Sequence, residues 1–369
     1  MGYLSDHHYI LGLFSIILGC FVLRTCSMNA APASFVFGDS LVDVGNNNYI
    51  VTLSKANYMP NGMDFPTRQP TGRFTNGRTI ADILGQELGL ENFTPPYMAP
   101  TTVGPAVLQG VNYASGAGGI LSHTGNAFGG RIHLDAQIDN FAHTREYVIS
   151  SLGMPAALSL LRSALFSVVI GSNDLINNYL TPVVSVPERA VVSPEEFVEA
   201  MISKYRMQLM RLYLLGARKI IVANVGPIGC IPYERDTNPS AGSNCVEFPN
   251  QMAQSYNKRL KDLVLELRSN LEGALIVYAD VYRIVADIIQ NHKNYGFEVA
   301  DFACCFLTGR FGGLVPCGPT SKVCPDRSKY VFWDPYHPTD AANIAIARRL
   351  LDGDLNDIFP MNVRQLVGA

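Results

Sequence analysis

The stretch F-V-F-G-D-S-L-V-D-V-G-N, residues 35–46, joins an apolar run directly to a glycine, an acid and a serine. A short aromatic and β-branched run of this kind is typical of a strand buried on both faces of a parallel sheet. Gly38, Asp39 and Ser40 then follow where that strand would end. These residue types are common in turns, but a serine at a strand end can also be a nucleophile that the sheet holds in place. The remainder of the chain decides between the two interpretations.

Similar apolar runs recur at wide intervals along the chain. They cover residues 111–114, 165–170, 219–225 and 275–279. Helical patterns lie between them and after them. Ser193 begins one as an N-cap followed by proline and two acids, and Gly216 ends it. Further helices are expected over residues 252–267 and 339–351. This alternation predicts an α/β fold, one domain with a mainly parallel sheet covered by helices on both faces.

The residues that follow the predicted strands indicate where a site would lie, because ligands of an open parallel sheet bind beyond the carboxyl ends of its strands. Ser40 follows the first strand, Gly116 the second, Asn173 the third and Gly226 the fourth. We therefore expect a serine, a glycine-rich backbone segment and an asparagine to gather at one edge of the sheet.

A serine nucleophile needs a base, commonly a histidine that a carboxylate orients. His337 stands in the stretch W-D-P-Y-H-P-T-D, and Asp334 precedes it by three residues in a proline-stiffened turn. A lone D-x-x-H pair is weak evidence, and His133 with Asp135 is the alternative pair. Asp334 and His337 are our predicted acid and base, and Ser40 is the predicted nucleophile.

Acyl transfer also needs hydrogen-bond donors for the developing oxyanion. Three donors are expected to converge: the backbone N–H of Ser40, the backbone N–H of Gly116 and the side-chain amide of Asn173. Gly116 as a turn residue and Asn173 as a helix N-cap are the ordinary alternatives. For Asp39 and Asp43 we expect turn and capping roles.

The N-terminus differs from the rest of the chain. Residues 10–23 are an almost unbroken apolar run, shorter than the ~20 residues of a membrane-spanning helix. This predicts a secretory signal peptide over residues 1–31, cleaved after about residue 27–31, and a single domain over residues 32–369. We expect no stable membrane span and a secreted, extracellular protein. The net charge of −3, with no long run of Lys or Arg, speaks against a nucleic-acid partner.

Cysteine usage agrees with an oxidising compartment. Six cysteines follow the predicted signal, and their spacing does not fit a tetrahedral zinc site, so disulfides are expected. They are Cys230, Cys245, Cys304, Cys305, Cys317 and Cys324. Cys230 and Cys245 form the obvious local pair. Asn92 heads an N-x-T sequon and is a glycosylation candidate.

Four blocks together resemble the plant-type GDSL esterase/lipase family of the SGNH hydrolase superfamily. They are F-V-F-G-D-S-L-V-D-V-G-N-N-N, V-N-Y-A-S-G-A-G-G-I, V-V-I-G-S-N-D and W-D-P-Y-H-P-T-D-A-A-N. The resemblance implies a three-layer α/β/α sandwich of flavodoxin-like type, with Ser40, Gly116, Asn173, Asp334 and His337 in the site. In the second block this chain reads G-A-G-G where many relatives have G-G-A-G, so Gly116 or a neighbour supplies the N–H.

The leading functional hypothesis is a secreted serine esterase or lipase that acts on acyl esters without a metal or organic cofactor. An extracellular acyltransferase with the same triad is the alternative, and a non-catalytic wall or carbohydrate binder is a third possibility. The expected partner is an ester substrate, which is a lipid, a polyester or an acetylated sugar, and we expect a monomer.

Overall fold

The computed structural model describes residues 31–181 and 190–369, and residues 32–369 form one compact unit. The predicted signal peptide lies outside the described residues, except for Ala31. The central sheet has the strand order β1-β2-β3-β4-β9. The first four strands run parallel, and β9 pairs antiparallel with β4. They are β1 (Ser34–Gly38), β2 (Leu165–Val169), β3 (Lys219–Ala223), β4 (Leu275–Ala279) and β9 (Ile358–Phe359).

The predicted strand over residues 111–114 is the exception, because only Asn112 makes an isolated bridge, to Val36. The segment still runs parallel beside β1. The Val36 N–H donates to the Val111 carbonyl at 3.0 Å, and the Tyr113 N–H donates to the Val36 carbonyl at 2.7 Å. On its other side, Asn112 forms a second isolated bridge, to Pro96, and its main chain bonds to Pro95 and Tyr97. Counted as an irregular edge strand, it gives the flavodoxin-like order, whose switch point lies at the end of β1.

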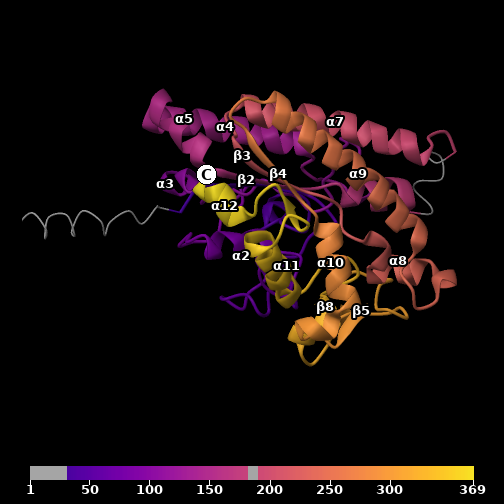
Figure 1. The fold of residues 1–369 in the computed structure, drawn as a ribbon. Helices are drawn as coiled ribbons and strands as arrows, with labels where there is room; N and C mark the ends of the chain where they lie inside the picture. Colours follow the sequence, from indigo (N-terminus) through magenta and orange to yellow (C-terminus); the bar gives the residue numbers. More distant parts are fainter. Residues whose placement is uncertain (1–30, 182–189) are drawn as a thin grey trace, which may run out of the picture. The chain divides into compact units, whose positions relative to one another are not determined.

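Helices cover both faces of the sheet, so the sheet and the two helical layers form a three-layer sandwich (Figure 1). This confirms the predicted fold class. One layer contains α4 (Leu134–Leu152), α5 (Met154–Ser163), α7 (Pro194–Leu214) and α9 (Glu247–Asn270). The other layer contains α2 (Ile80–Glu87), α10 (Val281–Gln290), α11 (Asp340–Asp352) and α12 (Val363–Gly368). Shorter helices are α3 (Pro105–Leu108) and α8 (Pro232–Thr237), and a π-helical turn covers Asp174–Leu180.

Alternation along the strands assigns side chains to the two layers. Phe35 and Phe37 of β1 pack on Phe141 of α4, with ring centroids 5.3 and 5.8 Å apart. Phe166 of β2 reaches the same Phe141 ring at 5.3 Å. The intervening residues of β2, Ser167 and Val169, therefore face the α2, α10 and α11 layer. A cavity lies on that second face.

The predicted helices begin at capped positions. The Ser193 side chain accepts the Glu196 N–H, and the Glu196 carboxylate accepts the Ser193 N–H, so α7 starts with a capping box. Thr339 caps α11 by accepting the Ala342 N–H. The helix predicted over residues 252–267 is longer in the structure, because α9 spans Glu247–Asn270.

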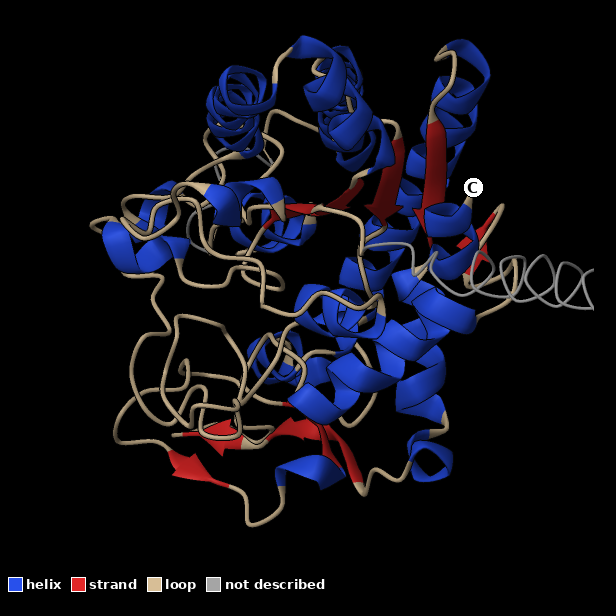
Figure 2. Ribbon diagram, turned by 90° about the vertical axis from the view of Figure 1, so that its left-hand side faces the viewer, coloured by secondary structure: helices blue, strands red, loops and turns tan. Residues whose placement is uncertain are grey.

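A loop-rich region precedes α11 and carries two small sheets (Figure 2). β5 (Val299–Ala303) pairs with β8 (Tyr330–Phe332), and β6 (Cys305–Phe306) pairs with β7 (Lys322–Val323). The predicted disulfides are present, including the expected local pair. They join Cys230 to Cys245, Cys304 to Cys324 and Cys305 to Cys317.

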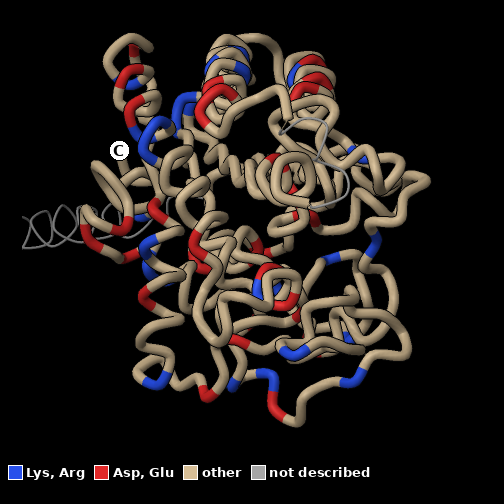
Figure 3. The backbone as a smooth tube through the Cα atoms, turned by 90° about the vertical axis from the view of Figure 1, so that its right-hand side faces the viewer, with Lys and Arg blue, Asp and Glu red and all other residues tan. Residues whose placement is uncertain are grey.

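The described part of the chain holds no helix that is both long and apolar enough to cross a membrane. Lysine and arginine are interspersed with aspartate and glutamate along it (Figure 3). The sequon residue Asn92 is exposed in a loop.

Candidate active site

Ser40 lies in the turn that directly follows β1, and this turn is held from several sides. The Asp39 N–H donates to the Val169 carbonyl of β2 at 3.1 Å. Gln137 of α4 brackets Gly38, accepting its N–H at 2.9 Å and donating to its carbonyl at 2.8 Å. A Cβ at Gly38 would lie 2.3 Å from the Val169 carbonyl oxygen, so only glycine fits there. The end of β1 therefore presents Ser40 at a fixed position.

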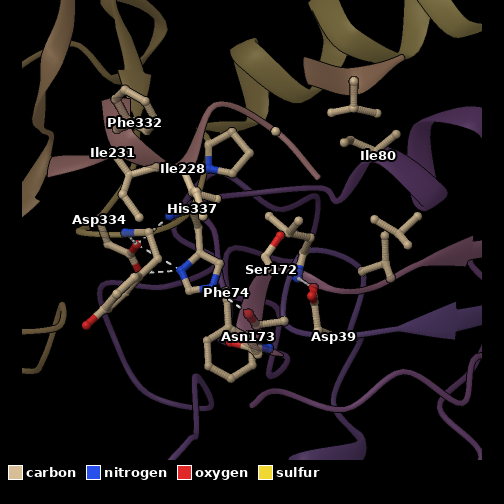
Figure 4. Close-up of a pocket in the computed structure, with 18 of the residues that line it drawn as sticks. Asp39, Phe74, Ile80, Ser172, Asn173, Ile228, Ile231, Phe332, Asp334 and His337 are labelled. Atoms are coloured by element: carbon tan, nitrogen blue, oxygen red, sulfur yellow. Dashed lines mark hydrogen bonds and ion pairs between the residues drawn. The ribbon is translucent and has the colours of Figure 1, made fainter. Parts of the chain in front are cut away.

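The fold brings His337 to Ser40 across nearly the whole chain. The His337 Nε2 lies 2.7 Å from the Ser40 Oγ. The opposite ring nitrogen, Nδ1, lies 2.8 Å from both carboxylate oxygens of Asp334 (Figure 4). His337 and Asp334 are buried, with exposed fractions of 7% and 5%, so the ion pair that forms when His337 takes a proton is shielded from water. The three groups form a continuous chain of hydrogen bonds.

Local structure holds the acid and the base in this orientation. The Asp334 Oδ1 accepts the N–H groups of Tyr336 and His337, both at 2.8 Å. Trp333 is fully buried among the disulfides, and its indole N–H donates to the Asn61 side chain at 2.9 Å. Trp333 therefore packs the loop, whereas Tyr336 borders the pocket at the site.

The structure corrects the expectation for Gly116. Its backbone N–H donates to the Asp43 Oδ2 at 3.0 Å, within the core, and is thereby committed to that carboxylate. Asp43 also accepts the N–H groups of Gly45 and Asn46 through Oδ1, both at 2.8 Å. Asp43 therefore has the expected turn role, and it also ties the loop after Ser40 to the second block. In this arrangement Asp43 occupies the Gly116 N–H, and Gly116 joins the second block to the loop after Ser40.

Ala117, the next residue, borders the same pocket as Ser40 and Asn173. Its φ of 63° is in the left-handed region, which alanine rarely adopts. Among the described residues, neither the Ala117 N–H nor the Ser40 N–H has a hydrogen-bond acceptor. The sequence departs from G-G-A-G at this position, and it left open whether Gly116 or a neighbour supplies the N–H.

Asn173 does not cap the helix that follows it. One hydrogen of its amide nitrogen is donated to the Gly118 carbonyl at 3.0 Å, and its oxygen accepts from Asn177 at 2.8 Å. Since an amide nitrogen has two hydrogens, one remains for a ligand. The bond to Gly118 also joins the second and third blocks of the site.

The asparagines after Ser40 are a further part of the scaffold. The Asn46 amide donates to the carbonyls of Asn112 and Ala114, at 2.9 and 2.8 Å. The Asn47 amide donates to the Gly116 carbonyl at 2.9 Å. These side-chain-to-backbone bonds join the polar loop to segments about 70 residues away in the sequence.

Buried carboxyl groups surround the serine. Desolvation raises the pKa of Asp39 to about 7, although the Leu41 N–H and His337 oppose this shift. Desolvation also raises the pKa of Asp43 to about 6, against the N–H groups that it accepts. The Oδ2 of Asp39 has no hydrogen-bond partner among the described residues. Asp39 is thus a buried acid that holds the turn through Oδ1 only.

The alternative histidines lie elsewhere. His133 is 3.8 Å from Asp135 at the start of α4, and His292 contacts the Ile289 carbonyl. Neither borders the pocket that contains Ser40. No cluster of three or more His, Cys, Asp or Glu side chains suited to a metal ion occurs in residues 31–181 or 190–369.

Comparison with known proteins agrees with this arrangement. Residues 35–350 match the family of GDSL-like lipases and acylhydrolases. The chain belongs to this family. A GDSL esterase/lipase of Arabidopsis thaliana is 66% identical over 335 residues, which are 91% of this chain and 90% of the relative. Two further GDSL esterases/lipases of Arabidopsis thaliana are 55% and 51% identical and cover 91% and 90% of this chain. The alignments cover 91% and 87% of those two relatives.

Membership in the GDSL family confirms the resemblance inferred from the four blocks. It also makes the chain a carboxylic ester hydrolase, since the family consists of lipases and acylhydrolases. The matched span includes Ser40, Ala117, Asn173, Asp334 and His337.

Proposed function

We propose that this GDSL hydrolase cleaves acyl esters with Ser40 as nucleophile, His337 as general base and acid, and Asp334 as the group that orients His337. The observation that carries the proposal is the unbroken chain from the Ser40 Oγ through His337 to the Asp334 carboxylate. A serine hydroxyl attacks only when a base accepts its proton, and the His337 Nε2 lies within transfer distance at 2.7 Å.

In the first half-reaction, the Ser40 Oγ attacks the ester carbonyl carbon while His337 accepts the hydroxyl proton. The C–O bond to the alcohol then breaks, and His337 returns that proton to the leaving oxygen. In the second half-reaction, water attacks the acyl-enzyme, His337 again accepts and returns a proton, and the free acid leaves. Asp334 stabilises the positively charged imidazole in both halves.

For the oxyanion we propose three donors: the N–H of Ser40, the N–H of Ala117 and the free amide hydrogen of Asn173. Ala117 replaces Gly116 in this set, because Asp43 holds the Gly116 N–H. All three donors belong to residues that border one pocket. Donors held in advance by the scaffold favour the transition state, since they need no reorganisation when charge develops.

Labelling by a fluorophosphonate probe tests this proposal. We expect one covalent adduct on Ser40 in the native protein and none in Ser40→Ala, with an unchanged thermal unfolding midpoint. Absence of labelling and of ester cleavage in the native protein would favour the non-catalytic binder. Analysis of products with and without an added alcohol then separates the two catalytic hypotheses, because hydrolysis yields the free acid and acyl transfer yields a new ester.

We also propose that the protein is secreted as a monomer, with residues 1–31 removed and Asn92 glycosylated. The three disulfides and the exposure of Asn92 support secretion. Expression in plant cells tests this: the N-terminal sequence of protein recovered from the medium should begin near residue 28–32. Protein retained inside the cell with residues 10–23 intact would contradict it.

A further inference from the structure

The pocket that contains Ser40 continues into the core, on the second face of the central sheet. It has a volume of about 220 Å³. Its inner part is bordered by Ile221 and Ala223 of β3 and by apolar side chains of α2, α10 and α11. These walls are buried, with exposed fractions of 2% for both Ile221 and Ala223. The space therefore lies between the sheet and a helical layer, not on the surface.

The inner part of the pocket extends along helix α11. Ala342, Ile346 and Leu350 all border the pocket, and they are spaced at i, i+4 and i+8 along one stripe of the helix. Ala342 is five residues after His337, whereas Leu350 lies near the other end of α11. At 1.5 Å per residue, the stripe extends for about 12 Å. The pocket thus follows α11 away from His337.

Two other helices complete the walls. Ile80 and Leu84 on α2 are spaced at i and i+4, and Val281, Val285 and Ile288 on α10 are spaced at i, i+4 and i+7. Figure 4 shows Ile80 and Phe332 on the opposite side of His337 from Asn173. The wall residues of the three helices are aliphatic, so the inner part has no charged group from any of these elements.

A cavity with such walls binds apolar groups in preference to water. An apolar cavity of about 150 Å³ in another protein stays dry and accepts benzene. The whole pocket, with its open end included, has a volume of about 220 Å³, and the length of the α11 stripe suits a linear chain better than a ring. A core cavity also lowers the free energy of unfolding roughly in proportion to its volume. A ligand that fills the cavity therefore stabilises the fold.

The other end of the pocket is open to solvent and has a different character. Its border includes Lys55 and Tyr58, which are partly exposed, and Leu53, which is 81% exposed. In acyl-enzyme chemistry the alcohol must leave and water must enter while the acyl group stays on the serine. The exchanging groups therefore use the open end, and the retained acyl chain occupies the closed end.

We infer that the protein is selective for esters of medium- to long-chain aliphatic acids, and that the acyl chain lies in the cavity between β3 and the α2, α10 and α11 layer. This inference rests on the serine mechanism proposed above. An extended chain advances about 1.2 Å per bond, from the span of a peptide residue. The stripe from Ala342 to Leu350 then accommodates about ten bonds.

Two series of esters test the inference with the native protein. One series varies the acyl chain of p-nitrophenyl esters from acetate to palmitate, below their critical micelle concentrations. The other varies the alcohol chain of alkyl acetates. We expect kcat/KM to rise along the acyl series by up to about fourfold per methylene, and by at least about tenfold from acetate to decanoate. The alcohol series should stay nearly flat.

Variants along the α11 stripe add a test of position. Ala342→Leu should block the cavity near the serine and abolish the gain beyond short chains. Leu350→Trp should shorten only the longest chain that is accepted. Ala347→Leu is the matched control, because Ala347 is fully buried on the same helix but does not border the pocket. Ala347→Leu should leave the acyl profile unchanged and change acetate hydrolysis by less than about twofold.

The outcomes separate this inference from the serine mechanism. A native enzyme that cleaves acetates best, or whose chain dependence lies in the alcohol series, would overturn the acyl-chain assignment while leaving the mechanism intact. Absence of fluorophosphonate labelling in the native protein would instead contradict the mechanism. If a variant fails to fold, the two native series still decide the question.

Discussion

The exchange Asp334→Asn tests the orientation of His337 with little change of shape. In the native structure, the Asp334 Oδ1 accepts the Tyr336 and His337 N–H groups at 2.8 Å, and both carboxylate oxygens lie 2.8 Å from the His337 Nδ1. An asparagine oxygen can keep the two backbone bonds. Its NH₂ group then faces the His337 Nδ1 and donates to it. The ring proton is thereby placed on Nε2, opposite the Ser40 hydroxyl, where the ring can no longer act as a base.

The expected loss in kcat is about 10⁴-fold, as for the same exchange in a serine protease triad. This corresponds to about 5.5 kcal/mol of activation free energy. Loss of the charge-assisted bond costs about 1.5–3 kcal/mol of stability, or a decrease of roughly 2–4 °C in the unfolding midpoint of a domain of this size. Asp334→Ala should be less stable than Asp334→Asn, because it leaves the Tyr336 and His337 N–H groups without their acceptor.

The assay is steady-state hydrolysis of a short p-nitrophenyl ester, with the unfolding midpoint measured on the same samples. Asp135→Asn is the matched control, since Asp135 is the carboxylate beside His133, at 3.8 Å. It should leave kcat within about twofold of the native value. A folded Asp334→Asn enzyme that retains more than about 1% of native kcat would refute the orientation argument. A large loss in Asp135→Asn would reassign the base to His133.

Three other changes test the remaining parts of the site. Asn173→Ala should lower kcat by about 10²–10³-fold with a smaller effect on KM, because one oxyanion donor is lost; near-native kcat would exclude Asn173 from that role. Ala117→Gly should keep activity and raise the free energy of unfolding by up to about 1 kcal/mol in chemical denaturation, because alanine is strained at a φ of 63°; a loss of stability would contradict the strain. The pKa of Asp39 rises to about 7 on folding, from 3.8, so its contribution to stability falls as pH increases from about 4 to 7. Asp39→Asn should therefore raise the unfolding midpoint more at pH 8 than at pH 5, and a pH-independent difference would refute the burial argument.

Much of the local structure was predictable because it depends on neighbouring residues. Ser193 and Thr339 start helices by accepting N–H groups three residues later in the chain. Asp334 reaches His337 within one turn, and Cys230 reaches Cys245 across a short loop. Each of these contacts closes a small loop at little entropic cost, so residue type and spacing are sufficient evidence.

Other features depend on hydrogen bonds and disulfides to groups that are distant in the sequence. The segment at residues 111–114 has the composition of a strand, yet Val111 and Tyr113 bond to β1 while the main chain of Asn112 bonds to the loop at Pro95 and Tyr97. The pairing of Cys304 with Cys324 and of Cys305 with Cys317 likewise follows from the fold of the loop. Adjacent cysteines offer two equivalent pairings, and their order in the sequence does not distinguish them.

The sequence by itself determined the fold class, the strand-end positions of Ser40 and Asn173, and the local turn that joins Asp334 to His337. Only the tertiary structure decided that Gly116 gives its N–H to Asp43, so that Ala117 faces the pocket. Only the tertiary structure creates the apolar cavity beside α11. The physical reason is the same in both cases: the direction of an N–H group and the space between packed layers depend on contacts between segments many residues apart. No periodicity or spacing within one segment records such contacts.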